Sequence, residues 1–363
     1  MKITCVAYLG SRGGAQRQII LLANNLAKAG HSVSLINLTG GNALYEISPE
    51  VSLYNFSSEN NKNSFFQRYL ILRSCLKIIK PDVSIHFWLQ SAYFCSFMPK
   101  LLCGKIIYAE RTDPGSASYS GVTKFLRYFS FKRVDAFAFQ SKGARNFFGK
   151  HIQQRSFVIP NAHSIPEGIL TEICSKREKT IITVGRLHPQ KNQELLLKAF
   201  ASLTNIIPDY KLEIYGDGEL HDKLIALAKE LDVENRVLIH PSCSNIFEKV
   251  HKASLFVLSS DYEGMPNALM EAMALGVPCI STDCRPGGAR ELIEDGVNGW
   301  IVPRNDVDAL AKKIRFVLKD SCNIESVAKK AAEIRLRNSE QVIYRMWNKN
   351  IKYVARGKNA DLD

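Results

Sequence analysis

Apolar runs alternate with helix-like patterns from the first residue of the chain. Residues 2–9 form a short apolar run that is typical of a buried strand. Residues 15–29 place apolar side chains at helical spacing, and Gly30 follows as a helix terminator. Residues 32–38 are apolar again. A strand, a glycine-containing loop, a helix and a second strand predict the opening of a parallel, doubly wound α/β sheet.

The alternation is interrupted once, by the polar segment 161–179, and then restarts. Two βα series on one chain predict two Rossmann-like domains, at 1–165 and 166–340, with ligands beyond the carboxyl ends of the strands and a cleft between the domains. The further predicted elements are helices at 64–79, 192–203, 219–231, 244–252, 267–275, 306–318 and 323–355, and strands at 82–88, 105–109, 134–139, 180–184, 211–215, 236–240, 254–258 and 277–281.

Charge changes this picture because it is unevenly spread. The formal net charge is +13, and residues 1–165 hold 20 Lys/Arg against 7 Asp/Glu, whereas residues 166–363 hold 28 of each. The excess in the first half suggests an anionic partner, for which nucleic acid, an acidic membrane surface and a phosphorylated substrate are the candidates. A basic domain without such a partner is the alternative.

Cysteine content and hydropathy indicate the compartment. The nine cysteines are odd in number and lack metal-ligand spacing, so we expect reduced thiols in a cytoplasmic protein. No stretch of 18 uncharged apolar residues occurs, so we predict no transmembrane helix. The N-terminal apolar run suits a strand better than a signal peptide.

Two cations lie in the loop VGRLHPQKN, residues 184–192, between a predicted strand and a helix. Arg186 and Lys191 beside a helix N-terminus would form a clamp for a diphosphate. An exposed basic loop without a ligand is the alternative.

Two carboxylates lie in or near a second loop, within residues 259–282. Glu263 follows a buried strand, Pro266 and Asn267 lie at a predicted helix start, and Glu271 falls on the second turn. Carboxylates repel phosphate but accept hydrogen bonds from sugar hydroxyls. Together with the cationic loop they favour a nucleotide sugar as ligand, although a surface glutamate and a solvated helix glutamate are the alternative.

The motifs resemble glycosyltransferase family 4, a retaining family with the GT-B fold, and in particular its members that build bacterial surface polysaccharides. The resemblance is strongest between about residues 180 and 318. It rests on the motifs GRLHPQK (185–191), YGDG (215–218), EGMPNALMEAMALGVPCIST (263–282), GGARELIEDGVNGWIVP (287–303), GGAQR (13–17), SKG (141–143), RTDP (111–114) and IPN (159–161).

The resemblance implies a role for each matching residue. Arg186 and Lys191 would stabilise the departing diphosphate, and Glu263 would contact hydroxyls of the donor sugar. Glu271 would bind the ribose, and Gly14 would let the first loop approach the donor. The donor pocket would be lined by Gly264, Met265, Pro266 and Asn267. The family generally requires no metal or other cofactor, and its last helix, here 341–363, tends to cross back onto the first domain.

The sequence departs from the family after the strand at 105–109. Many members carry a histidine there, whereas this chain has Glu110 and Arg111. Glu110 would replace the histidine as a sugar acceptor or would pair with Arg111. His86, at the end of a predicted strand, is another candidate for orienting the acceptor or the sugar.

Aromatic and basic residues are interleaved at 63–81 and 124–133, both in the basic half. Such segments suit an anionic membrane interface, although a core-facing aromatic side with solvated cations is the alternative. The expected membrane contacts are Arg68, Arg73, Lys77, Lys80, Lys124 and Arg127. Similar proteins extend a lipid-diphosphate-linked oligosaccharide, so we expect peripheral association with the cytoplasmic face of the inner membrane.

The sequence hypothesis is therefore a retaining transferase of a hexose or N-acetylhexosamine, with a UDP-sugar favoured as donor and a lipid-linked saccharide as acceptor. A GT-B-type nucleotide-sugar epimerase or hydrolase is the first alternative. A nucleic-acid-binding protein is a distant one, because no binding motif for nucleic acid is present and the second half is neutral.

Overall fold

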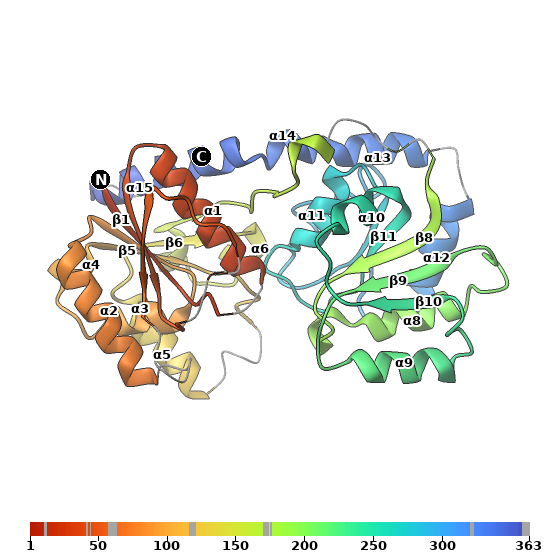
Figure 1. Cartoon of the computed structure of the whole chain (residues 1–363), viewed down its shortest axis with the longest axis horizontal. Helices are drawn as coiled ribbons and strands as arrows, with labels where there is room; N and C mark the ends of the chain where they lie inside the picture. Colours follow the sequence, from red (N-terminus) through yellow and green to blue (C-terminus); the bar gives the residue numbers. More distant parts are fainter. Residues whose placement is uncertain are drawn as a thin grey trace. The chain divides into compact units, whose positions relative to one another are not determined.

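The chain forms two compact units, Met1–Ala162 with Gln341–Asp363 and His163–Glu340 (Figure 1). Both are α/β units with one parallel sheet each. The computed structural model describes residues 1–10, 13–40, 43, 45–56, 64–115, 121–169, 174, 176–319 and 323–357.

The first unit is built on a parallel sheet with the strand order β3-β2-β1-β4-β5-β6-β7. Its strands are β1 Lys2–Ala7, β2 Ser32–Asn37, β3 Val51–Asn55, β4 Val83–His86, β5 Lys105–Ala109, β6 Ala136–Phe139 and β7 Ser156–Val158. Its helices are α1 Gly14–Lys28, α2 Phe65–Ile79, α3 Leu89–Cys95, α4 Lys100–Cys103, α5 Gly121–Phe131, α6 Lys142–Asn146, α7 Lys150–Gln153 and α15 Glu340–Ala355.

Alternate residues of these strands belong to two separate apolar clusters. Ile3, Cys5 and Ala7 pack with α1 and with α15, whose Trp347 is buried. Val6 packs on the other side with residues of α2, α3, α4 and α5. Because side chains alternate across a strand, the two clusters mark the two faces of one sheet covered on both sides, as parallel sheets are.

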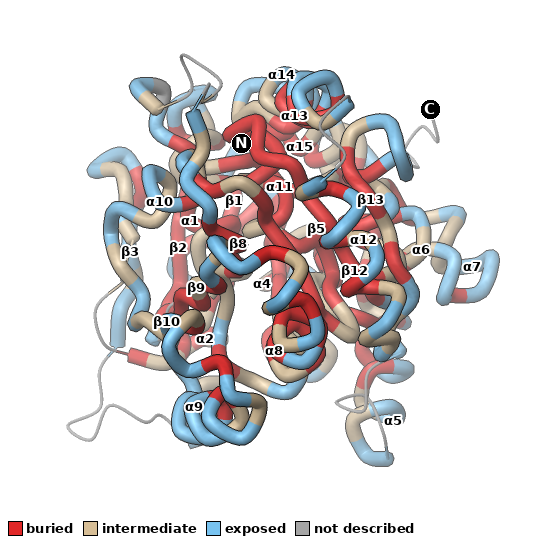
Figure 2. The backbone as a smooth tube through the Cα atoms, turned by 90° about the vertical axis from the view of Figure 1, so that its right-hand side faces the viewer, coloured by how far each residue is buried: buried red, intermediate tan, exposed pale blue. Residues whose placement is uncertain are grey.

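The second unit repeats the plan with the order β10-β9-β8-β11-β12-β13. Its strands are β8 Glu178–Val184, β9 Lys211–Tyr215, β10 Val237–His240, β11 Ala253–Leu258, β12 Cys279–Thr282 and β13 Trp300–Val302. Its helices are α8 Gln193–Ala201, α9 His221–Glu230, α10 Ile246–Lys252, α11 Asn267–Ala274, α12 Val307–Lys319, α13 Ile324–Ala332 and α14 Ile334–Arg337, with 3-10 turns at Glu167–Ile169 and Pro189–Lys191. The core residues appear red along the strands in Figure 2.

The predicted α/β architecture is confirmed, but several details differ, and the short helices α3, α4, α6 and α7 were not among the predicted elements. Strands β3, β7 and β13 were not predicted from the pattern, because β7 and β13 have three residues each and β3 buries only Val51 fully. The single helix predicted at 323–355 is wrong: it is broken at Glu333 and near the buried Asn338 into α13, α14 and α15.

The cysteines in the described ranges are free thiols, and six of these eight are buried. Burial raises the pKa of Cys5 to about 12 and that of Cys284 likewise, so these thiols stay protonated at neutral pH. Cys322 lies outside the described residues.

Candidate functional site

The donor-site candidates lie where the strand order of the second sheet reverses. Strands β8 and β11 are neighbours, but the chain continues from β8 outward to β9 and from β11 outward to β12. Ligands of open α/β sheets bind beyond the carboxyl ends of strands at such a switch point. The loop after β8 carries Arg186 and Lys191, and the loop after β11 carries Glu263.

An ion pair joins these two loops. Lys191 Nζ contacts Glu263 Oε1, and the two side chains are only 18% and 9% exposed. The same carboxylate oxygen accepts a hydrogen bond of 2.8 Å from Ser260 Oγ. A cation and a carboxylate are thus held side by side in a partly dehydrated position, which strengthens their electrostatic effect on any ligand there.

Gln190 links Glu263 to Arg186 and was not predicted as a site residue. Its amide nitrogen donates to the Tyr262 carbonyl at 2.8 Å and lies 3.5 Å from Glu263 Oε2. Its amide oxygen accepts from the exposed Arg186 guanidinium at 3.3 Å. Gln190 belongs to the GRLHPQK motif, but its hydrogen bonds join two loops, and sequence spacing does not reveal that the loops meet.

Glycines let the loops approach each other closely. Gly216 has φ +155°, and a Cβ added there would lie 1.9 Å from the Gly185 carbonyl oxygen. A Cβ at Gly288 would lie 2.5 Å from the Gly264 carbonyl oxygen. The YGDG and GGAR motifs therefore have a steric reason: their backbones support the loops that carry the cations and the carboxylate.

Helix α11 begins directly after the Glu263 loop. Pro266 is its N-cap, so the helix starts at Asn267, the first residue of the helix predicted at 267–275. Gly264, Met265 and Pro266 are buried, and Glu271 on the second turn accepts a hydrogen bond of 3.2 Å from Ser164 Oγ. A helix N-terminus at this edge favours a negatively charged ligand group.

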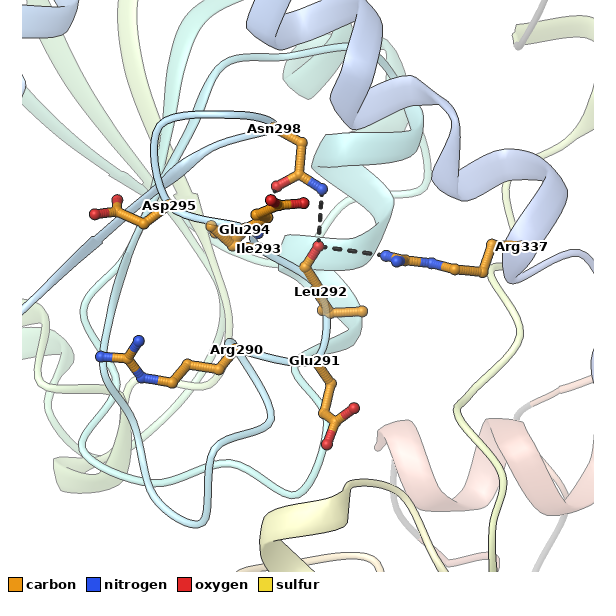
Figure 3. Close-up of a pocket in the computed structure, with 8 residues that line it drawn as sticks. All are labelled: Arg290, Glu291, Leu292, Ile293, Glu294, Asp295, Asn298 and Arg337. Carbon is orange, nitrogen blue, oxygen red and sulfur yellow. Dashed lines mark hydrogen bonds between the residues drawn. The ribbon is translucent and has the colours of Figure 1, made fainter. Parts of the chain in front are cut away.

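Two cavities lie in the second unit. One of about 550 Å³ is lined by residues 283–287, 303 and 304, and it borders the donor loop because the Glu263 N–H donates to the Arg285 carbonyl at 2.7 Å. The other, of about 450 Å³, is shown in Figure 3. There the side chains of Asn298 and Arg337 both donate to the Leu292 carbonyl, at 3.1 and 3.3 Å, so Asn298 braces its own loop and Arg337 holds that loop to α14.

Two predicted residues of the first unit occupy contrasting positions. Gly14 is exposed at the start of α1. His86 is fully buried; its Nδ1 lies 3.0 Å from Ser91 Oγ, and burial lowers its pKa to about 3. His86 is thus enclosed as a neutral core side chain, and no ligand contact is proposed for it.

Glu110 and Arg111 are held within the first unit. The Glu110 carboxylate accepts hydrogen bonds from Tyr108 Oη and from the backbone N–H groups of Arg111 and Thr112. The Arg111 guanidinium lies 3.9 Å from the centroid of the Phe87 ring and donates to Asn161 Oδ1 at 3.0 Å. Burial lowers the pKa of Arg111 to about 9, so it remains charged at neutral pH.

The cations expected at a membrane differ in exposure. Lys77, Lys80 and Lys124 are exposed, whereas Arg68 and Arg73 are half-buried. Arg127 is a correction: it is buried and donates to the Pro114 carbonyl at 2.8 Å, because α5 packs this side against the sheet.

Neither a metal cluster nor a membrane span is found in the part of the chain that the structure describes. No group of three or more His, Cys, Asp or Glu side chains there is arranged to hold a metal ion. None of the described helices combines the length and apolar character needed to cross a bilayer.

Comparison with known proteins matches both halves of the chain. Residues 173–335 match the model "Glycosyl transferases group 1", and residues 12–164 match "Glycosyltransferase Family 4". A Campylobacter jejuni N-acetylgalactosamine-N,N'-diacetylbacillosaminyl-diphospho-undecaprenol 4-alpha-N-acetylgalactosaminyltransferase is 31% identical over 94% of this chain and 96% of its own.

A second C. jejuni enzyme and a solved structure extend the match over the whole chain. The enzyme, an alpha-1,4-N-acetyl-D-galactosaminyltransferase acting on a diNAcBac-PP-undecaprenol-linked saccharide, is 29% identical over 99% of this chain and 100% of its own. The Anabaena protein HepE, solved with UDP, has a TM-score of 0.78 at 18% identity over 97% and 100% of the two chains. The predicted resemblance is confirmed, and the chain is a member of the glycosyltransferases with the GT-B fold, combining a family 4 half and a group 1 half.

Proposed function

We propose that this glycosyltransferase moves a hexose or N-acetylhexosamine, with retention of anomeric configuration, from a nucleotide sugar to a lipid-diphosphate-linked saccharide in bacterial polysaccharide, O-antigen or glycan assembly. The observation that carries the proposal is the paired Lys191 and Glu263 at the switch point of the second sheet, bridged by Gln190 to Arg186. No metal or other cofactor is part of the proposed reaction.

The pair matches the two halves of a nucleotide sugar. Its diphosphate carries negative charge that grows as the glycosidic bond breaks, and Lys191 and Arg186 would stabilise that charge. Its sugar hydroxyls are donors, for which the Glu263 carboxylate is an acceptor. Gly264, Met265, Pro266 and Asn267 would line the pocket, with the first backbone N–H groups of α11 facing the phosphates.

The remaining donor contacts concern the nucleoside and the first unit. Glu271 would exchange its hydrogen bond with Ser164 for the ribose hydroxyls, and Gly14 would approach the sugar diphosphate. Uridine is the favoured base, supported by the UDP found with HepE. Glu110 and Arg111, which stand after β5 where many family members carry a histidine, would orient the acceptor or the sugar.

The acceptor class follows from the two Campylobacter relatives, both named for saccharides linked to undecaprenol diphosphate. Such an acceptor resides in a bilayer, so the proposal includes peripheral attachment to the cytoplasmic face of the inner membrane. The basic first half is where an anionic lipid diphosphate or surface would be accommodated.

A titration followed by a transfer assay tests the proposal. Unfolding temperature is measured with UDP, GDP, ADP and their sugar conjugates; a true ligand at about 100 times its dissociation constant adds roughly 2.7 kcal/mol to the free energy of unfolding. The stabilising donor is then incubated with a short-chain lipid-diphosphate saccharide, and the anomeric configuration of the product is read by NMR.

The expected result is stabilisation by uridine compounds, reduced in Glu271→Gln, and an axial or equatorial product bond matching the donor. An inverted product would refute retention. Turnover of the nucleotide sugar at the same rate without acceptor would favour the epimerase or hydrolase alternative.

A further inference from the structure

An aromatic face covers one side of the first unit. It consists of exposed apolar side chains on α2, after α3 and on α5: Phe65 (52% exposed), Phe97 (53%), Val122 (74%), Phe125 (67%), Tyr128 (66%) and Phe129 (39%). Ring contacts join the helices: Phe65 to Tyr93 at 6.2 Å, Tyr93 to Phe97 at 4.9 Å, and Phe97 to Phe129 at 5.8 Å between centroids. Exposed apolar groups that form one connected surface mark an interaction site.

One side of helix α5 packs against the first unit, and the opposite side carries exposed apolar residues. Ser130 and Phe131 lie with Arg127 on the side packed against the unit. Val122, Phe125 and Phe129 follow at spacings of three and four residues, so they share the opposite side. In Figure 2 the tube of α5 is mostly tan and pale blue, in agreement with this exposed second stripe.

The segments that carry most of the aromatic face are basic. Lys100, Lys124 and Lys132 are exposed beside it, and Lys132 Nζ lies 4.8 Å from the centroid of the Tyr128 ring. Residues 83–109 and 121–134 contain no Asp or Glu. The following acid, Asp135, is paired with Lys105 at 3.2 Å.

We propose that the aromatic face inserts into the headgroup region of an anionic bilayer, with Lys100, Lys124 and Lys132 at the phosphates. The inference rests on the proposed function, which requires access to a lipid-linked acceptor. Aromatic and aliphatic side chains flanked by lysines complement such a surface. A second copy of the chain is disfavoured as occupant, since a two-fold contact would bring the same lysines together.

Vesicle flotation tests this surface with matched variants of the full chain. Vesicles are made of phosphatidylcholine alone or of equal parts phosphatidylcholine and phosphatidylglycerol. The test variant is Val122→Ser, Phe125→Ser, Tyr128→Ser. The control, Ile225→Ser, Phe316→Ser, Leu336→Ser, removes three apolar side chains of the second unit that are 36%, 48% and 78% exposed.

The test variant should partition at least roughly thirtyfold less onto the anionic vesicles, because each methylene-sized group withdrawn from a bilayer changes partition about fourfold. The control should bind like the wild type. Replacing Lys100, Lys124 and Lys132 by Gln should reduce partition about fivefold per lysine on anionic vesicles and leave it unchanged on phosphatidylcholine.

Equal flotation of the test variant and the wild type would overturn the proposal, as would an equal loss in the control. So would a wild-type dimer in sedimentation that becomes a monomer in the test variant, because the face would then join two copies. Transfer by the wild type to a water-soluble acceptor separates the two claims: transfer without vesicle binding refutes only the membrane face, and vesicle binding without transfer from any donor refutes only the proposed function.

Discussion

Replacing Lys191 by methionine removes the cation from the Lys191–Glu263 pair and keeps much of the side-chain volume. The Glu263 side chain is 9% exposed, so its carboxylate stays in a poorly hydrated position with Ser260 Oγ as a neutral donor. An uncompensated buried charge costs about 3–5 kcal/mol, and the 18% exposure of Lys191 reduces the expected loss to about 2–3 kcal/mol. For a unit of this size, that lowers the unfolding temperature by roughly 5–10 °C.

Two further variants make the measurement diagnostic. Lys191→Met with Glu263→Gln removes both charges, so it should regain most of the lost unfolding temperature while sugar transfer stays nearly abolished. Lys179→Met breaks an ion pair with Asp209 whose side chains are 60% and 66% exposed, and it should leave the unfolding temperature almost unchanged because exposed pairs contribute little. Calorimetry without nucleotide and the transfer assay are run on all four proteins.

The unfolding temperatures and transfer rates of these variants test both the burial argument and the role of Lys191. A Lys191→Met protein that unfolds with the wild type would refute the burial argument. A double variant as unstable as the single one would show that the loss comes from packing and not from the unpaired carboxylate. Near-wild-type transfer by Lys191→Met would refute the assignment of Lys191 to the donor diphosphate.

Two further perturbations probe the support of the fold. Gly216→Ala puts a Cβ 1.9 Å from the Gly185 carbonyl oxygen at φ +155°, so it should lower the free energy of unfolding by about 2 kcal/mol and weaken donor binding. Gly168→Ala is the control, because the space around Gly168 is open and stability should not change. Thermal unfolding measures both variants. His86 is neutral in the fold with a pKa of about 3 against 6.5 unfolded, so its contribution is complete above pH 6.5 and is lost as the pH falls towards 3. The free energy of unfolding of the wild type, relative to that of His86→Gln, should fall by about 1.4 kcal/mol per pH unit in that window. Urea unfolding measures both values, and the same pH dependence in the two proteins would contradict the prediction.

The alternation of apolar runs and helical patterns was sufficient to predict the architecture because both sheets are parallel. Their strands are buried on both faces and therefore appear as largely apolar segments, such as Lys105–Ala109, whose bounds were predicted to the residue. Short edge strands give no such signal. The break near Asn338 was missed because the helical pattern continues through it.

The site was predictable only in part. Motif residues such as Lys191 and Glu263 were identified, but not their contact, since two loops 72 residues apart meet only when the sheet forms. For His86 and Arg127 the residues were identified, but the surroundings of their side chains were not. Sequence gives their charge and position, while the direction in which each side chain points is decided by packing: His86 towards Ser91, and Arg127 towards the Pro114 carbonyl.

The Lys191–Glu263 contact also suggests how the proposed enzyme would discriminate between its donor and the nucleoside diphosphate that it releases. Diphosphate alone would satisfy Lys191 and Arg186 but would separate Glu263 from its cation and leave the carboxylate near phosphate. An intact nucleotide sugar supplies hydroxyl donors at the same time, so both members of the pair exchange one partner for another. Pairing before binding therefore disfavours the product relative to the substrate. In the proposed site neither residue would bind the donor alone. The two opposite charges of Lys191 and Glu263 would be satisfied together by one ligand that carries both phosphates and hydroxyls.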